Sequence, residues 1–399
     1  MLLILFSHSS LAGSAIPLYK VIDDRLELMH SVAAYKWINN QKIEDKSREK
    51  VIIEKARQSA LKQGLTPDSV ETFFTAQIEA AKEVQLYWFT QWQQGNAPTR
   101  AADLGTKVRP QLLFLGMQIT EALSSGQPII SGSAFKKLIA VEGLTAETKQ
   151  QLYSSLKNIK QFSNRLQQVV QTGELRIGTT GDYAPFSIWN DDSPQPSGID
   201  IELGRNLAHS LGVSPVFVKT SWPTLMQDLT AGNYDIAMSG VSITHSRKNW
   251  GAFSTPYHIG GKTPIALCEN KNKFGSLSVI DQQSVRVIVN PGGTNERFLD
   301  ANIHSAKKIV HMDNRTIFQQ LIESKADVMI TDRIEVEFQT NLHLELCSTM
   351  TENLNSQKKS FFMPKDQSLI QAVNLWLKKQ QSSGFLQLLF KKNLTQLSN

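Results

Sequence analysis

One glutamate of this 399-residue sequence, Glu335, stands in a context that suits a proton donor. Glu335 follows the apolar run 328–330, with Thr331 and Asp332 between them. This order predicts a buried strand followed by a helix, with Thr331 or Asp332 at the N-cap and Glu335 in the first turn. In an α/β domain such a helix start faces the crevice where ligands bind, and a glutamate shielded from water there can act as a general acid. The simpler alternative is a glutamate that only complements the helix dipole.

Basic and amide side chains recur at helical spacing in the first half of the chain. Arg25 and Lys36 are eleven residues apart, about three turns of helix, so they share one face. Arg48 and Arg109 belong to later helical patterns. These cations outnumber the acidic residues that could pair with them, so they can together bind a small dianion inside the bundle. The alternative is that they lie on solvated helix faces and form surface ion pairs.

The elements that position these residues are predicted to be helices throughout residues 17–172. Apolar residues there recur every three or four positions, and no strand pattern appears. We therefore expect an all-α helical bundle. The expected helices cover residues 25–37, 47–63 (capped by Asp45), 66–92, 99–123 (kinked at Pro110), 134–140 and 146–170.

Strands and helices alternate after Gly173, which predicts an α/β domain of two lobes. The expected strands cover residues 175–180, 215–218, 235–240 and 328–331, and the expected helices cover 198–211, 222–230 and two segments after Gln367.

The composition excludes several classes of function. Hydrophobic residues make up 41% and charged residues 20%, which is ordinary for a soluble globular protein. The formal charge of +6 comes from dispersed Lys and Arg without a basic stripe, so no nucleic-acid partner is predicted. No stretch after the first residues approaches the ~20 apolar residues of a membrane span. The eight histidines show no ligand spacing, so the sequence predicts no metal.

The beginning of the chain and its cysteines indicate export. Residues 1–15, MLLILFSHSSLAGSA, resemble a signal peptide that ends near Ala15, although the usual positive charge is missing. A buried N-terminal strand is the alternative. Cys268 and Cys347 are the only cysteines and are consistent with one disulfide in an oxidising compartment, but the sequence does not show that they meet. We expect a periplasmic protein.

Three stretches of the first half form one pattern: Arg25-x10-Lys36, Ile43-Glu-Asp-x2-Arg48 and Gln77-Ile-Glu-Ala-x4-Gln85. Over most of residues 20–112 this pattern resembles the exported all-helical chorismate mutases. The resemblance implies that Lys36 and Gln85 hydrogen-bond the ether oxygen of chorismate. It implies substrate contacts for five further residues, with Arg25, Arg48 and Arg109 at the carboxylates, Asp45 beside a cation and Glu49 at the hydroxyl.

The implied reaction suits these residue types. Rearrangement of chorismate to prephenate needs a compact substrate conformer and donors aimed at the breaking C–O bond, without a nucleophile or a metal. One position departs from the pattern, because Ala81 stands where many relatives carry Ser or Thr. One donor to a carboxylate is therefore absent, and weaker binding is expected.

Two stretches of the second half, Gly240-Val-Ser-Ile-Thr-His-Ser-Arg247 and Phe253-Ser-Thr-Pro-Tyr257, resemble the periplasmic binding-protein fold of type II. In that fold two lobes close on a ligand, and the residue that matches Arg247 pairs with a ligand carboxylate. By itself this resemblance implies a module that binds an amino acid.

Narrower motifs favour an enzyme. Five of them occur between residues 170 and 393: Thr179-Thr-Gly-Asp-Tyr-x-Pro-Phe186, Thr220-Ser-Trp-Pro223, Gly261-Lys-Thr-Pro264, Val289-Asn-Pro-Gly-Gly-Thr-Asn-Glu296 and Thr331-Asp-x-Ile-Glu335. Together they resemble cyclohexadienyl dehydratase, and both cysteines fall at the cysteine positions of that family.

The dehydratase resemblance implies a role for each motif. Glu335 would protonate the ring hydroxyl of prephenate, so that water and CO2 leave and the ring becomes aromatic. Lys262 would contact the substrate, Trp222 would form an apolar wall that raises the pKa of the acid, and Arg247 would hold the side-chain carboxylate. Other residues expected to line the cleft are Asp182, Ser239, Asn290, Asp332 (which would favour the amine of arogenate), and Thr294 and Asn295 at an anion-binding helix start.

The sequence thus predicts a multidomain protein with a signal peptide (1–15), an all-α chorismate mutase domain (16–171) and a two-lobed α/β dehydratase domain (172–399). Expected partners are chorismate, prephenate and arogenate, with a homo-oligomer as an open option, and no cofactor is predicted. The alternatives are an amino-acid-binding protein with a non-catalytic helical domain, and a mutase domain that serves only as an assembly platform.

Overall fold

Two compact units make up the computed structural model, which describes residues 18–126, 129–190 and 192–395. The division falls between Phe162 and Ser163. Helix α7 (Arg165–Thr172), which spans the expected boundary at 171/172, belongs to the second unit, where Val169 joins the core. The expected signal peptide lies outside the described residues. None of the described helices has the length and apolar character that crossing a bilayer requires.

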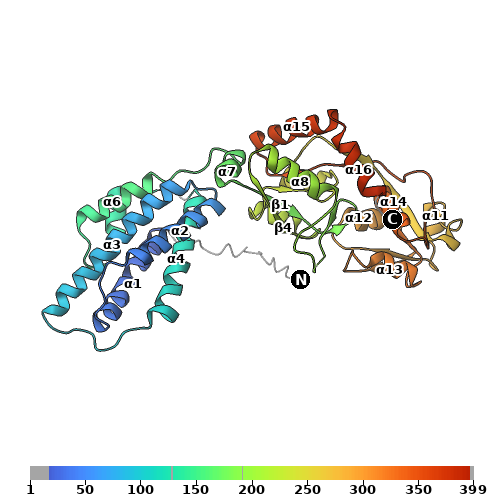
Figure 1. The fold of residues 1–399 in the computed structure, drawn as a ribbon. Coiled ribbons are helices and arrows are strands. Elements are labelled where there is room, and N and C mark those ends of the chain that lie inside the picture. Colours follow the sequence, from blue (N-terminus) through green and yellow to red (C-terminus); the bar gives the residue numbers. More distant parts are fainter. Residues whose placement is uncertain (1–17, 127–128, 191, 396–399) are drawn as a thin grey trace, which may run out of the picture. The chain divides into compact units, whose positions relative to one another are not determined.

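Helices build the first unit, as predicted, and the long ones run side by side (Figure 1). Their apolar faces enclose one core, in which Leu26, Phe73 and Val84 are fully buried. The helices are α1 (Leu18–Ile38), α2 (Lys46–Lys62), α3 (Pro67–Gln93), the short π-helix η1 (Leu104–Val108), α4 (Arg109–Ser124), α5 (Gly132–Leu138) and α6 (Ala146–Lys157).

A side-chain cap and a proline explain where two of these helices begin. Asp45 precedes α2 and its side chain accepts a hydrogen bond of 3.0 Å from the backbone N–H of Arg48, as predicted. The predicted helix 99–123 with a kink at Pro110 is wrong, because α4 begins at Arg109 and Pro110 lies in its first turn. A proline costs no hydrogen bond there, since the first N–H groups of a helix have no partner within it.

The predicted helix 146–170 is also wrong, because it is two helices. α6 ends at Lys157 and α7 begins at Arg165, after Asn164, whose side chain accepts a hydrogen bond of 2.8 Å from Gln167 N–H. The chain leaves one unit and enters the other in this interval. Apolar residues keep helical spacing on both sides of this short break, so the sequence predicted one continuous helix.

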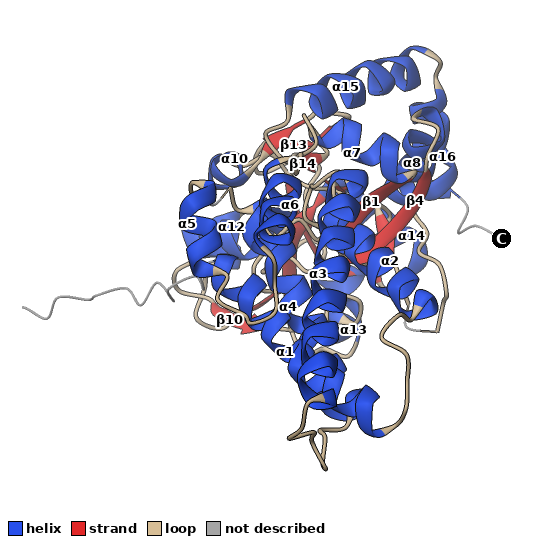
Figure 2. Ribbon diagram, turned by 90° about the vertical axis from the view of Figure 1, so that its left-hand side faces the viewer, coloured by secondary structure: helices blue, strands red, loops and turns tan. Residues whose placement is uncertain are grey.

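The second unit has two five-stranded sheets, one in each lobe, and the strands drawn in red in Figure 2 belong to this unit. The first lobe has the strand order β4-β1-β5-β14-β6, and the second has β10-β9-β11-β8-β12. First-lobe strands and the small pair β2–β3 are β1 (Glu174–Thr179), β2 (Asp182–Tyr183), β3 (Ser187–Ile188), β4 (Ser214–Lys219), β5 (Ile236–Ala237), β6 (Ala252–Phe253) and β14 (Phe362–Met363). Second-lobe strands are β8 (Lys262–Leu267), β9 (Arg286–Val289), β10 (Lys307–Val310), β11 (Val328–Asp332) and β12 (Leu346–Ser348).

Helices follow these strands in alternation, so the α/β prediction is confirmed. The predicted helix 222–230 is shorter than expected and begins at Leu225, which leaves Trp222 in the preceding turn. The helices are α8 (Ile199–Ser210), α9 (Leu225–Thr230), α10 (His245–Trp250), the 3₁₀ turn η2 (Cys268–Asn270), α11 (Leu277–Ile280), α12 (Thr294–Asn302), α13 (Ile317–Ile322), α14 (Arg333–Leu342), α15 (Gln367–Ser382) and α16 (Phe385–Thr395).

Two short strands carry the chain between the lobes. β7 (His258–Gly260) leads from the first sheet to the second, β13 (Gln357–Lys359) leads back, and the two pair antiparallel. In the second sheet, β11 is buried at every residue and lies antiparallel to β8, in a register that sets Asp332 opposite Lys262. Cys268 and Cys347, at neighbouring ends of β8 and β12, form a disulfide.

Candidate active sites

A cavity of about 430 Å³ lies among α1, α2, α3 and α4 of the first unit. Its walls combine cations with apolar groups such as Met29, Val32 and Leu112. All seven residues that the sequence singled out in this unit line the cavity: Arg25, Lys36, Asp45, Arg48, Glu49, Gln85 and Arg109. Four helices thus bring together side chains that are far apart in the sequence.

Arg25 is the most deeply buried cation of this cavity, at 5% exposure. Its Nη1 donates to Gln77 Oε1 at 2.7 Å, and its guanidinium carbon lies 5.6 Å from the centre of the Phe74 ring. Burial lowers the pKa of Arg25 to about 10, so the group remains charged at neutral pH. Its Nε has no hydrogen-bond partner among the described residues, and that donor is free for an anion.

Lys36 and Gln85, the two expected donors to the ether oxygen, are both bonded to backbone carbonyls. Lys36 Nζ donates to Ile43 O at 2.6 Å, and Gln85 Nε2 donates to Ala81 O at 2.9 Å. Burial lowers the pKa of Lys36. The Lys36 ammonium has three donors and therefore retains donors for a ligand. The second N–H of Gln85 donates to Met29 Sδ at 3.8 Å, a weak acceptor that a ligand oxygen can replace.

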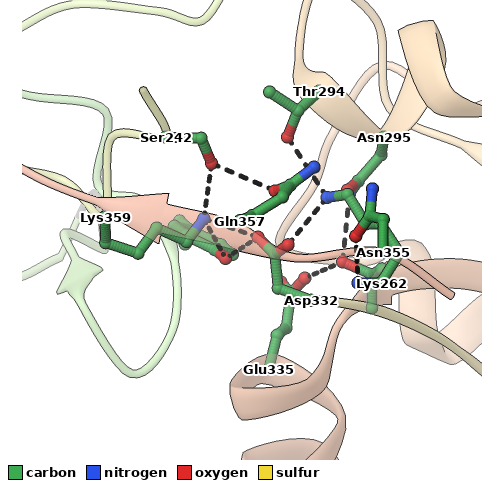
Figure 3. A network of polar contacts seen from close by, with 12 residues as sticks. Ser242, Lys262, Thr294, Asn295, Asp332, Glu335, Asn355, Gln357 and Lys359 are labelled. Atoms are coloured by element: carbon green, nitrogen blue, oxygen red, sulfur yellow. Dashed lines mark hydrogen bonds and ion pairs between the residues drawn. The ribbon is translucent and has the colours of Figure 1, made fainter. Parts of the chain in front are cut away.

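In the second unit, Asp332 lies between two lysines that approach from opposite sides (Figure 3). Lys262 Nζ is 2.9 Å from Oδ1, and Lys359 Nζ is 2.6 Å from Oδ2, which also accepts a hydrogen bond from the Tyr183 hydroxyl. Burial alone would raise the pKa of Asp332, but Lys262 and Lys359 together with these hydrogen bonds hold it well below its usual range. Asp332 is therefore a carboxylate.

Glu335 lies one turn further along the chain and differs from Asp332 in its surroundings. Its side chain is 1% exposed and accepts a hydrogen bond from the Thr331 hydroxyl. Burial raises the pKa of Glu335 to about 8, and the neighbouring charge of Asp332 acts in the same direction. At neutral pH Glu335 is therefore a protonated acid beside an ionised one.

Lys262 is fully buried and joins Asp332 to the predicted anion-binding loop. Its Nζ donates to Thr294 Oγ1 at 3.1 Å and to Asn295 Oδ1. Asn295 in turn donates to Asn290 Oδ1 at 3.1 Å and to Thr331 Oγ1 at 3.0 Å. These bonds connect the start of α12 with the strand that leads to Glu335.

Aromatic and basic side chains of the first lobe face this cluster. Trp222 Nε1 donates to Asp182 Oδ1 at 3.1 Å, and the Arg247 guanidinium carbon lies 5.6 Å from the centre of the indole. Arg247 is buried and donates through Nη1 to Ser242 O at 2.9 Å, while its Nε has no partner among the described residues. Burial lowers the pKa of Arg247 to about 10 and leaves it charged.

The cavity between the two lobes measures only about 20 Å³. Its lining comes from both lobes and includes Trp222, Arg247 and Asn290. Little free volume remains between the lobes, so the cleft is closed in this structure.

Comparison with known proteins identifies both units. Residues 175–396, more than half of the chain, match the bacterial extracellular solute-binding proteins, family 3, and residues 17–86 match chorismate mutase type II. A cyclohexadienyl dehydratase of Pseudomonas aeruginosa is 45% identical over 56% of this chain and 83% of its own length. A monofunctional chorismate mutase of Enterobacter agglomerans is 31% identical over 39% of this chain and 88% of its own length. The chain therefore belongs to the family 3 solute-binding proteins through its second unit and to the type II chorismate mutases through its first.

The second unit, hereafter the dehydratase unit, also resembles a solved structure. The ancestral amino acid-binding protein AncCDT-1, described as a precursor of cyclohexadienyl dehydratase, is 31% identical with a TM-score of 0.54, and the match covers 58% of this chain and all of that one. The first unit is hereafter the mutase unit. The predicted family resemblances and the two fold classes are thus confirmed.

Several groups that were expected to contact a ligand in the dehydratase unit already have partners within the protein. Ser239 is fully buried and hydrogen-bonded to Thr180 Oγ1 at 2.8 Å. Gly292 N–H in the anion-binding loop donates to Glu296 at 2.8 Å. Asp332, expected to favour a substrate amine, has both oxygens engaged by lysines.

The sequence analysis did not identify four lysines at these sites, Lys55, Lys62, Lys82 and Lys359, of which Lys82 and Lys359 form ion pairs. Lys82 lines the mutase cavity, 3.8 Å from Glu49, and Lys359 lines the dehydratase cavity. Lys82 lies beside Ala81 within the motif that ends at Gln85, so its position on that helix could have indicated that it lines the cavity. Lys359 lies outside all five dehydratase motifs, and no local pattern marks it.

Proposed function

We propose that the chain carries out two consecutive reactions of phenylalanine biosynthesis. The mutase unit rearranges chorismate to prephenate, and the dehydratase unit converts prephenate to phenylpyruvate and arogenate to phenylalanine. The observation that carries the second activity is the pair of neighbouring carboxyl groups with opposite protonation, Asp332 held ionised by lysines and Glu335 held neutral by burial. A binding site needs no such acid.

In the mutase unit, positioning and charge supply the catalysis. Arg25, Arg48 and Arg109 bind the two carboxylates and hold the substrate in its compact conformer. Lys36 and Gln85 donate hydrogen bonds to the ether oxygen, where negative charge grows as the C–O bond breaks. Atoms only rearrange, so no proton donor is consumed.

In the dehydratase unit, Glu335 gives its proton to the ring hydroxyl of prephenate. The C–O bond breaks and water leaves, while the bond to the ring carboxylate breaks and its electron pair enters the ring, which becomes aromatic as CO2 departs. Arg247 holds the side-chain carboxylate and Lys262 contacts the substrate beside the acid. Glu335 ends as a carboxylate and takes a proton from solvent before the next turnover.

The runner-up function is amino-acid binding without turnover. The fold and a carboxylate-binding arginine suit both functions, and one solved relative is described as an ancestral amino acid-binding protein. The buried acid Glu335 and the nearby lysines favour catalysis. Glu335 can donate a proton and the surrounding charges set its pKa, whereas a binding site needs only affinity.

Feeding chorismate to the purified full chain tests the proposal. Wild type is expected to release phenylpyruvate with prephenate as intermediate. Glu335→Gln is expected to accumulate prephenate, because the amide cannot donate an acidic proton, with phenylpyruvate formation lower by about 100-fold to 10,000-fold. Unchanged phenylpyruvate release by this variant contradicts the assignment, and amino-acid binding without any product supports the runner-up.

We further propose that the protein works in the periplasm, with residues 1–15 as its signal peptide. Its relatives include secreted chorismate mutases, such as the Yersinia pestis protein, and extracellular solute-binding proteins. The Cys268–Cys347 disulfide suits an oxidising compartment. Fractionation of cells followed by N-terminal sequencing of the mature protein tests both statements.

A further inference from the structure

Lys359 lies on one of the two strands that connect the lobes of the dehydratase unit. Its backbone belongs to the first-lobe side, because Tyr257 N–H donates to Lys359 O at 3.0 Å and Ser242 forms a bridge with it. Its side chain reaches Asp332 at the end of β11, in the second lobe. One buried side chain thus extends from a connecting strand to both lobes.

The Lys359 ammonium has a hydrogen-bond acceptor for each of its three protons. Nζ lies 2.6 Å from Asp332 Oδ2, 2.9 Å from Ser242 Oγ and 3.0 Å from the Tyr183 hydroxyl oxygen. Tyr183 and Ser242 belong to the first lobe, and the Tyr183 hydroxyl itself donates to Asp332. Parting the lobes would break the bonds from Lys359 and Tyr183 to Asp332, while Lys359 keeps Ser242 and Tyr183 and Asp332 keeps Lys262. Loss of a short ion pair between buried groups is costly, so these bonds favour the closed arrangement.

We propose that Lys359 is a positioning residue for the dehydratase reaction. It fixes the Asp332 carboxylate of the second lobe against Tyr183 and Ser242 of the first, and so holds the closed cleft in which Glu335 is shielded from water. It acts through Asp332 and the closure of the lobes, not by contact with the reacting atoms. This inference rests on the proposed dehydratase activity.

The charges around Lys359 give the proposal a specific signature. Loss of the Lys359 cation removes one charge that favours the Glu335 carboxylate, but it also loosens the closure that keeps water away from Glu335. Because burial is the largest cause of the raised pKa of Glu335, we expect that pKa to fall in the variant. The titratable and charged groups that face the ammonium are Asp332 (β11), Glu335 (α14), Lys262 (β8), Arg247 (α10), Tyr183 (β2), Asp200 (α8) and His258 (β7).

The test compares Lys359→Met with Lys358→Met in the full chain. Lys358 is the exposed neighbour on β13 and is the matched control for loss of a lysine from this strand. Lys359→Met is expected to lower kcat for prephenate at least tenfold, to move the alkaline limb of the pH profile to lower pH, and to increase hydrogen exchange around Tyr183 and Asp332. Lys358→Met is expected to match wild type, and the mutase rate of both variants is the internal control for a folded chain.

Tyr183→Phe keeps the ring and removes one hydroxyl of the network, so it decides the question if Lys359→Met does not fold. It is expected to change kcat and exchange in the same direction, to a smaller extent. A folded Lys359→Met or Tyr183→Phe variant with wild-type kcat, pH profile and exchange overturns the inference. Failure of wild type itself to consume prephenate overturns the proposed function instead.

Discussion

The Lys262 ammonium lies 2.9 Å from Oδ1 of Asp332, the residue directly opposite it in the register of β8 and β11. Glu335, three residues further along, is hydrogen-bonded by the Thr331 hydroxyl instead. The lysine charge therefore stabilises the Asp332 carboxylate, and Glu335 keeps its proton. Two neighbouring carboxyl groups acquire different protonation states, because both are buried but only Asp332 forms ion pairs with the lysines.

The pH dependence of prephenate turnover should report the proton on Glu335. With a pKa of about 8, Glu335 is protonated at neutral pH and loses its proton as the pH rises. We expect kcat/KM for prephenate to be flat near neutral pH and to fall tenfold per pH unit above about pH 8. A fall centred near the ordinary glutamate pKa would contradict this assignment.

Replacing Glu335 should also stabilise the dehydratase unit. The pKa of Glu335 in the folded state, about 8, exceeds its ordinary value of 4.5, so the folded protein binds a proton across this range that the unfolded chain does not. The free energy of unfolding therefore decreases as the pH rises from 4.5 to about 8. Glu335→Gln has no such titration, and its melting temperature relative to wild type should increase across this interval. The same difference in melting temperature between the two proteins at pH 5 and at pH 8 would refute the prediction.

Lys36→Ala should separate the two activities. Removal of this donor from the mutase cavity is expected to lower prephenate formation from chorismate by about 100-fold or more, because the charge on the ether oxygen loses its donor. Turnover of added prephenate should remain at the wild-type rate. Lys50→Ala, which removes an exposed lysine of α2 outside the cavity, is the matched control. A similar loss in both variants would point to overall charge.

Ala81→Ser should restore a donor to the mutase cavity. Ala81 lines the cavity, and a hydroxyl there can donate to a substrate carboxylate. We expect KM for chorismate to fall about fivefold with little change in kcat, measured by loss of chorismate absorbance. Ala76→Ser, on the same helix and outside the cavity, carries the same cost in helix propensity and should leave KM unchanged.

Removal of the disulfide should weaken the dehydratase unit alone. Cys268 and Cys347 are 79 residues apart, and the bond between them restricts the unfolded chain over that loop. The double serine variant is expected to lose roughly 2–4 kcal/mol of unfolding free energy in that unit, measured by denaturant titration. Reducing agent should destabilise wild type in the same way and have no effect on the variant, while mutase activity persists in both.

Local chemistry in the sequence was sufficient for much of the fold. Helical spacing and the Asp45 cap locate α2, and the apolar run before Thr331 locates β11, because side-chain burial and capping depend on near neighbours. The start of α4 at Arg109 and the break between α6 and α7 were missed. Both have local signals, Pro110 in the first turn of α4 and the Asn164 cap of α7, but the continuous helical spacing on either side concealed them.

The sequence by itself determined which residues could do the chemistry: the cations and amides of the mutase unit, and Glu335, Lys262 and Arg247 of the dehydratase unit. Only the tertiary structure decided which of these groups hold protons and which hold charge. Asp332 meets Lys359 27 residues away and Tyr183 149 residues away. The protonation of a buried carboxyl group depends on these distant neighbours and on the exclusion of water, and both arise only when the chain folds.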